Sequence, residues 1–93
     1  MGLHKHTRMN LEVRNLPEAF ILLSIMPGMD SNVRENLNLE HIAEIYQVFG
    51  LYDLILKTKE LEDMQQIDAI VAKIRQLEGI TNTVTMLVRK ASP

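Results

Sequence analysis

The chain has 93 residues, which is the size of one domain and leaves no room for a second independent core. Hydrophobic residues make up 46% of the chain and charged residues 24%, a composition typical of a folded protein rather than a disordered one. The net charge of -2 excludes a general polyanion-binding protein, and the absence of cysteine excludes disulfides, thiolate metal sites and cysteine nucleophiles. Because so small a domain buries only about 60–65% of its unfolded surface, we expect self-association to add stability.

Residues 1–16 show no sustained apolar periodicity and contain Lys5, Arg8 and Arg14 against one acid, Glu12. We expect them to form a flexible basic arm in front of a folded domain at residues 17–93. The N-terminus lacks the hydrophobic segment of a signal peptide, and the longest apolar run is too short to cross a bilayer. The sequence therefore predicts a cytoplasmic protein with no membrane contact.

The folded part opens with the apolar run 19–26, which is closed by Pro27 and Gly28. A short apolar run bounded by turn residues predicts a strand buried on both faces. Asp30 or Ser31 is then expected to cap a short helix that is exposed on its outer side.

Two runs of alternating apolar and polar residues, 42–49 and 52–59, predict the next two strands. Gly50 and Leu51 separate the two runs. A two-residue connection with glycine first is typical of a β-hairpin with a type II′ turn.

A second helix is predicted from apolar residues at helical spacing between Met64 and Leu77. Asp63 is the expected N-cap, with Gln66 as its capping-box partner. Gly79 is expected to end the helix, and residues 80–88 return to strand composition.

The elements follow in the order βαββαβ, the ferredoxin-like arrangement of the α+β class. This topology places both helices on one face of a four-stranded antiparallel sheet. The first predicted strand is apolar on both sides, with Phe20 and Leu22 opposite Ile21 and Leu23. An exposed apolar sheet face normally marks an interface, so we expect a homodimer that packs sheet against sheet, as in dimeric α/β-barrel proteins.

No group of residues predicts catalysis, a metal site or a cofactor. His4 and His6 lack a third ligand, and His41 has no companion histidine or cysteine. The sequence contains no nucleophile elbow, phosphate-binding loop or distinct pair of acids. RNA recognition on such a sheet needs aromatic residues beside basic ones, and aromatic residues make up only 4% of the chain.

The segment 49–53, Phe-Gly-Leu-Tyr-Asp, offers close backbone approach at Gly50, an aromatic wall at Tyr52 and a carboxylate at Asp53. These residues also fit a plain structural interpretation as turn and core residues, and the threonines at 81–85 fit that of β-branched strand formers.

Together with Pro27-Gly28, the helix end 77–80 and the strand Thr81-Asn82-Thr83-Val84-Thr85, the segment Gly50-Leu51-Tyr52-Asp53 resembles the C-terminal effector-binding domain of the Lrp/AsnC transcription regulators, the RAM domain. The resemblance covers roughly residues 17–90.

The resemblance implies that dimers join into tetramers, octamers or decamers and that an amino-acid effector binds between dimers. It implies a pocket lined by Gly50, Leu51, Tyr52, Asp53, Thr83 and Thr85. Backbone N–H groups and hydroxyls there suit a carboxylate. Asp53 would pair with the α-ammonium group or would instead hold the hairpin in shape.

The N-terminal DNA-reading domain of these regulators has no counterpart before the first predicted strand, so the chain resembles a stand-alone RAM domain with no direct DNA contact. It would modulate full-length Lrp/AsnC-type regulators, or bind its effector apart from DNA. Two alternatives remain open: a small dimeric α/β-barrel enzyme of the monooxygenase or isomerase kind, with a histidine or acid pointing into the barrel, and a structural adaptor that has lost its ligand.

Overall fold

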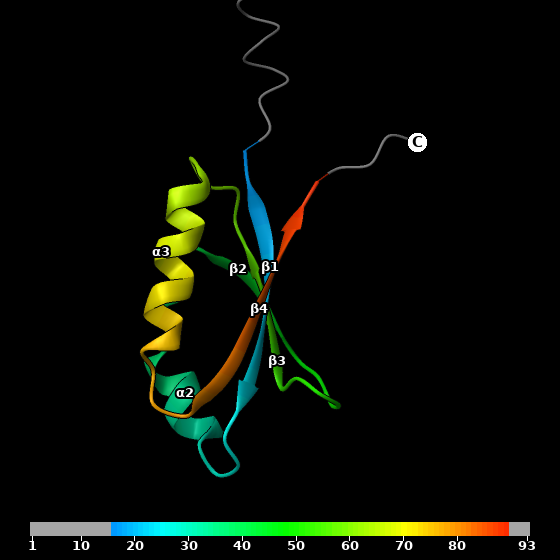
Figure 1. Cartoon of the computed structure of the whole chain (residues 1–93), viewed down its shortest axis with the longest axis vertical. Helices are drawn as coiled ribbons and strands as arrows, with labels where there is room; N and C mark the ends of the chain where they lie inside the picture. The colour runs from blue at the N-terminus through cyan, green and yellow to red at the C-terminus, as the bar shows by residue number, and fades with distance from the viewer. Residues whose placement is uncertain (1–15, 90–93) are drawn as a thin grey trace, which may run out of the picture.

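The computed structural model describes residues 16–89, in which two helices lie on one face of a four-stranded antiparallel sheet (Figure 1). The elements follow the chain as β1 (Glu18–Ile25), α2 (Asp30–Asn36), β2 (Ile42–Gln47), β3 (Leu54–Thr58), α3 (Met64–Arg75) and β4 (Ile80–Val88). The strands lie in the order β2-β3-β1-β4. The predicted ferredoxin-like fold is therefore confirmed. The predicted basic arm, 1–16, lies outside the described residues apart from Leu16.

The central strand β1 alternates between fully buried and half-buried side chains along its whole length. Ala19, Ile21 and Leu23 are completely buried under the helices, whereas Phe20 and Leu22 on the other face are half-buried. Since successive side chains of a strand point to opposite faces, the prediction of a strand buried on both faces holds for one face only in the single chain.

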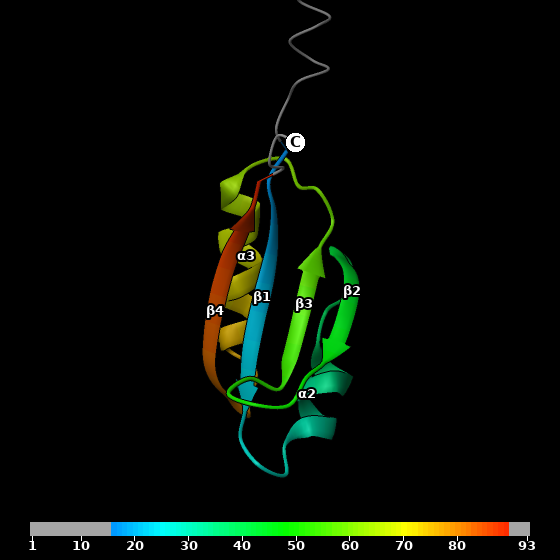
Figure 2. The same cartoon turned by 90° about the vertical axis from the view of Figure 1, so that its right-hand side faces the viewer.

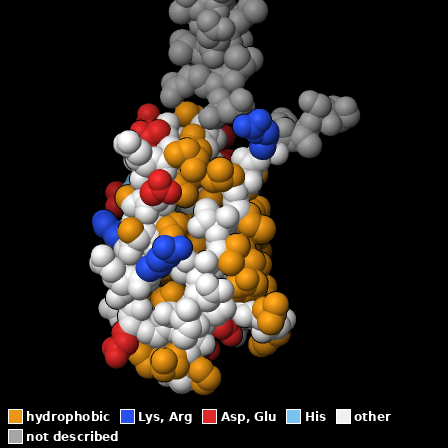
Figure 3. All heavy atoms as spheres, in the orientation of Figure 1, with side chains coloured by type: hydrophobic (Ala, Val, Ile, Leu, Met, Phe, Trp, Pro, Cys, Tyr) orange, Lys and Arg blue, Asp and Glu red, His pale blue; other side chains and the backbone are white. Residues whose placement is uncertain are grey.

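The other sheet face is apolar and uncovered by any helix. We call it the open face; its apolar side chains come from three adjacent strands and are Phe20, Leu22, Ile55, Val84 and Met86. Figure 3 shows hydrophobic side chains gathered along the side of the molecule that faces away from the helices. The open face therefore carries an apolar patch that no helix of residues 16–89 covers.

The second helix, α3, begins as predicted. The Asp63 carboxylate accepts a hydrogen bond from the Gln66 N–H at 3.0 Å, and the Gln66 side chain accepts one from the Glu62 N–H at 2.7 Å. The capping box is thus shifted by one residue, because Gln66 reaches the residue before the N-cap. The buried stripe consists of Ile67, Val71 and Ile74.

The first helix, α2, is not capped as predicted. It begins after Met29, and no side chain caps its N-terminus. Gly79 has φ +104° and forms the turn into β4, while α3 already ends at Arg75. A Cβ atom at Gly79 would lie 2.7 Å from the Met29 Cβ, so this glycine also permits the close approach of α2. None of the helices in residues 16–89 is long and apolar enough to cross a membrane.

Candidate functional site

Six residues, 48–53, join β2 to β3, so the predicted two-residue type II′ turn is wrong. Only the backbone bond from the Val48 N–H to the Asp53 carbonyl, at 3.0 Å, extends the pairing beyond the strands. The reason is that the Asp53 N–H donates instead to the Leu23 carbonyl of β1, at 2.8 Å. Figure 2 shows the loop passing in front of the end of β1.

The Asp53 carboxylate fastens this loop to the central strand. Its Oδ2 atom accepts a hydrogen bond from the Ile25 N–H at 2.7 Å. Charge-assisted bonds of this kind are stronger than neutral ones. In the single chain Asp53 therefore holds the loop in shape, which is the second of the two roles considered for it in the sequence analysis.

A second anchor of the loop was missed by the sequence analysis. The Ser24 hydroxyl donates to the Leu51 carbonyl at 3.1 Å, and the Thr81 hydroxyl donates to the Ser24 carbonyl at 3.2 Å. The loop, β1 and β4 are therefore connected through one serine. The available signal was that Ser24 alone interrupts the apolar run 19–26.

The tip of the loop exposes two large apolar side chains. Phe49 is 91% exposed and Leu51 88% exposed, and Gly50 with φ +147° lies between them. Phe49 was expected inside a strand, but β2 already ends at Gln47. Tyr52, next along the loop, is half-buried.

The two predicted threonines lie on the helix side of the sheet. Thr83 pairs with Leu23 and Thr85 with Ile21, and partners in an antiparallel pair share a face. The Thr83 hydroxyl accepts a hydrogen bond from Arg75 Nε at 3.0 Å. The loop bonds to β1, the neighbour of β4, but both threonine side chains point to the helix side, and no hydrogen bond in residues 16–89 joins either of them to the loop. The structure therefore groups the four loop residues together and leaves both threonines apart from them.

A small cavity of about 80 Å³ lies beside Asp53, between the loop and α2. Asp30 and Arg34 of α2 line it from the other side. The volume suits water molecules and is well below the roughly 300 Å³ at which small-molecule pockets begin.

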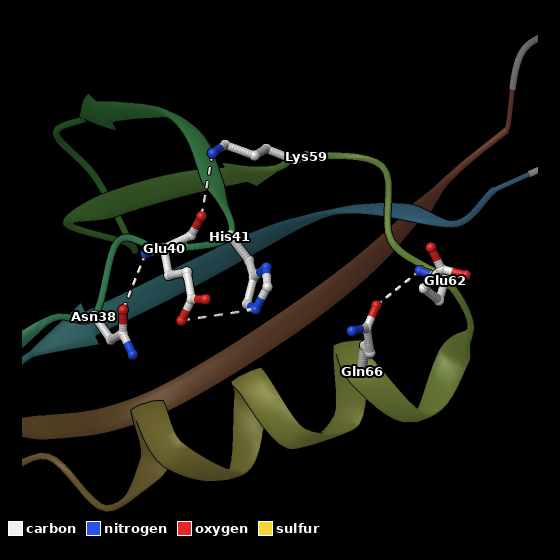
Figure 4. Close-up of polar contacts among 6 residues, drawn as sticks. All are labelled: Asn38, Glu40, His41, Lys59, Glu62 and Gln66. Atoms are coloured by element: carbon white, nitrogen blue, oxygen red, sulfur yellow. Dashed lines mark hydrogen bonds and ion pairs between the residues drawn. The ribbon is translucent and has the colours of Figure 1, made fainter.

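A larger groove of about 310 Å³ lies between α3 and the segment that joins α2 to β2 (Figure 4). His41 lines it, 4.0 Å from the Glu40 carboxylate, with 40% of its side chain exposed. This position differs from the enclosed apolar pocket that the enzyme alternative requires. No cluster of three or more His, Cys, Asp or Glu in residues 16–89 could hold a metal ion, and His4 and His6 lie outside that range.

The comparisons with known proteins agree with the fold. The family model described as the Lrp/AsnC ligand binding domain matches residues 18–92. The crystal structure of TTHA0845 from Thermus thermophilus is 33% identical with a TM-score of 0.73, and the match covers 83% of this chain and 98% of that chain. The hypothetical protein PHS023 from Pyrococcus horikoshii is 34% identical with a TM-score of 0.68, over 81% of this chain and 92% of that one.

One relative is much longer than this chain. A homocitrate synthase from Sulfolobus acidocaldarius is 30% identical over 80 residues, which is 80% of this chain but only 17% of the enzyme. That similarity therefore concerns one segment of the enzyme and carries no activity over to this chain. Since the family model matches most of its length, the chain belongs to the family of Lrp/AsnC ligand-binding domains.

Proposed function

We propose that this domain binds an amino-acid effector at the loop 48–53 and passes the binding signal on through self-association. The observation that carries the proposal is the construction of the loop. Asp53 and Ser24 fasten it to the sheet, while Phe49 and Leu51 protrude almost fully exposed. A rigid base with exposed apolar tips suits a contact with another surface.

The chemistry of the loop suits a zwitterion. Backbone N–H groups around Gly50 and the Tyr52 hydroxyl are hydrogen-bond donors for a carboxylate. Asp53 has one oxygen bound to the Ile25 N–H, and a carboxylate has about four acceptor positions in all. It is therefore able to accept from an α-ammonium group without releasing β1.

The threonines would enter this site from a second protomer. Thr83 and Thr85 lie on the helix side of the sheet, away from the loop of their own chain. A pocket that uses all six predicted residues therefore takes the loop from one copy and the threonines from another. Effector binding would then depend directly on assembly.

The open face supports the first level of that assembly. Its five apolar side chains form a contiguous patch over β3, β1 and β4. We infer that two copies pack these faces together into a homodimer, and that the loops then join dimers into larger rings. Burying such a patch stabilises the assembly by roughly 25 cal/mol for each Å².

The biological role that follows is to modulate transcription regulators by assembling with them. The domain would act on full-length Lrp/AsnC-type regulators by joining their rings. The homocitrate synthase relative supports a modular use, because a similar segment occurs there inside a longer chain.

A thermal-shift screen of the twenty amino acids tests the proposal. A ligand at a hundred times its Kd stabilises the folded state by about 2.7 kcal/mol, so a binder stands out clearly. With a binder in hand, Thr85→Val should weaken the shift, because the variant keeps the shape and loses the hydroxyl. Ser31→Ala, which removes an exposed hydroxyl on α2 outside the proposed pocket, is the control.

Two results would count against the proposal. If no amino acid raises the melting temperature, the ligand class is wrong. If Thr85→Val weakens binding no more than Ser31→Ala does, the threonine side of the pocket has no support, and Leu51→Ser then tests the loop side alone.

A further inference from the structure

The groove between α3 and the α2–β2 segment shares no residue with the loop site. Its floor is apolar: Ile42 and Ile74 are buried, while Leu37, Ile70 and Leu77 are half-buried. At about 310 Å³ it reaches the lower end of the range for small-molecule pockets, roughly 300–1,000 Å³. It lies on the helix side of the sheet, so a dimer through the open face leaves it accessible.

One wall of the groove carries a cation without a partner. Lys73 is the sole lysine or arginine among the residues that line it. No acid stands three or four residues away from Lys73 on α3, where an ion pair would form. Within the described part of the chain, its ammonium group makes no ion pair and no hydrogen bond.

The opposite wall is held in place by polar contacts (Figure 4). The Glu40 N–H donates to the Asn38 side chain at 3.0 Å, and the Glu40 carbonyl accepts from Lys59 Nζ at 3.2 Å. The Glu40 carboxylate lies 4.0 Å from His41. Because these contacts already hold the wall in place, little conformational entropy is lost when a ligand binds, which favours a preformed site.

These features select a ligand by charge and shape. The exposed ammonium of Lys73 is able to pair with one anionic group, and the negative charge of Glu40 across the groove disfavours a phosphate or a dicarboxylate. The floor calls for a short hydrocarbon chain. We infer that the groove is a second ligand site, which takes a short aliphatic carboxylate with its anionic end on Lys73.

The test uses the whole chain and two probes of equal shape, isocaproate and its uncharged amide. Titration is followed through the NMR methyl signals of Ile70 and Ile74. Isocaproate should give saturable shifts that the amide does not give. Leucine is titrated beside isocaproate to separate an amino acid from a simple carboxylate. If an α-ammonium group faces Glu40, Glu40→Gln should weaken leucine binding, whereas it should not weaken isocaproate binding.

Matched variants locate the site. Lys73→Met should weaken isocaproate binding at least about tenfold, since a charge-assisted hydrogen bond is lost. Arg89→Met removes the same charge from an exposed position just after β4 and should change nothing. Ala69→Phe should block the groove, while Leu51→Ser at the loop should leave binding intact.

Equal binding of isocaproate and its amide would overturn the inference, as would equal losses in Lys73→Met and Arg89→Met. An absence of saturable shifts would overturn it too, and is the result expected if another protein segment fills the groove. Loss of isocaproate binding in Leu51→Ser would assign the ligand to the loop site instead. Because leucine could also bind the groove, the amino-acid screen that tests the loop site is repeated in Lys73→Met, where a shift that persists belongs to the loop site.

Discussion

The carboxylate of Asp53 accepts a hydrogen bond from the backbone N–H of Ile25 at 2.7 Å, which fastens the β2–β3 loop to the end of the central strand. The N–H of Asp53 reinforces this contact by donating to the Leu23 carbonyl at 2.8 Å. A residue proposed to contact the effector therefore also has a structural task. Any loss of ligand binding in an Asp53 variant must be measured against its loss of stability.

The first prediction concerns that structural task. Asp53→Ala should lower the free energy of unfolding by about 1–3 kcal/mol, because the partly buried Ile25 N–H loses its acceptor. Asp53→Asn keeps an acceptor oxygen and should cost less. Urea denaturation measures both, with Asp68→Ala on the exposed side of α3 as the control. A variant Asp53→Ala as stable as Asp68→Ala would show that the bond contributes nothing.

The sequence predicted all six elements because each has a local signal, which is an apolar run, an apolar periodicity, a capping residue or strand composition. The stripe from Met64 to Leu77, for example, needs no information from elsewhere to predict α3. The loop could not be predicted in this way, since the partner of Asp53 lies 28 positions earlier in the chain. The local sequence around Gly50 favours a tight turn, but the bonds from Asp53 to β1 favour a longer loop, and those bonds exist only in the folded sheet.

The site was predicted in part for a similar reason. Alternation along the last strand shows that Thr83 and Thr85 share a face. Whether they share the helix side or the open face depends on the register of β4 against β1. In that register Thr83 pairs with the buried Leu23, so both threonines lie on the helix side. The resemblance to Lrp/AsnC domains implies which residues line the pocket, but not which side of the sheet each one occupies. Only the structure therefore shows that the loop residues and the threonines lie apart within one chain.

The second prediction compares two glycines. Gly79→Ala should destabilise the fold more than Gly28→Ala, although both have positive φ, +104° and +86°. Left-handed backbone costs a non-glycine residue roughly 1–2 kcal/mol, and this is the whole cost at Gly28, where a Cβ meets nothing within 4 Å. At Gly79 the contact with the Met29 Cβ adds about 1–3 kcal/mol of overpacking.

Thermal unfolding of the two glycine variants under one condition provides the measurement. Equal losses of stability would mean that α2 moves away from the β4 turn at little cost. The close approach of Met29 to Gly79 would then contribute little to the free energy of unfolding.

The third prediction concerns the open face. Leu22→Glu, in the centre of that face, should convert the assembly to monomers, because each copy would bury an unpaired carboxylate. Ala72→Glu adds the same charge on the exposed side of α3 and should leave the assembly intact. Sedimentation velocity at micromolar concentration distinguishes the outcomes. A native chain that sediments as a monomer would remove the basis for the dimer.

The last prediction concerns a titration at the edge of the sheet. The Tyr46 hydroxyl donates to the Glu44 carboxylate at 2.8 Å, and this bond is the main reason that the pKa of Tyr46 lies above its ordinary value of 10.0. Glu44→Gln should therefore lower the pKa of Tyr46. A titration by ultraviolet absorbance in a Tyr52→Phe background isolates this one phenol.

The sign of the pH effect follows from the direction of the shift. Because folding raises the pKa of Tyr46, the bond contributes its stability below the ordinary tyrosine pKa and loses it as pH rises through the raised value. Tyr46 and Glu44 pair with Ile55 and Lys57, on the same side of the sheet as the open face. If sheets pack together over β2, the pKa of Tyr46 should rise further with protein concentration, since burial disfavours the phenolate. A pKa independent of concentration would place β2 outside the dimer contact.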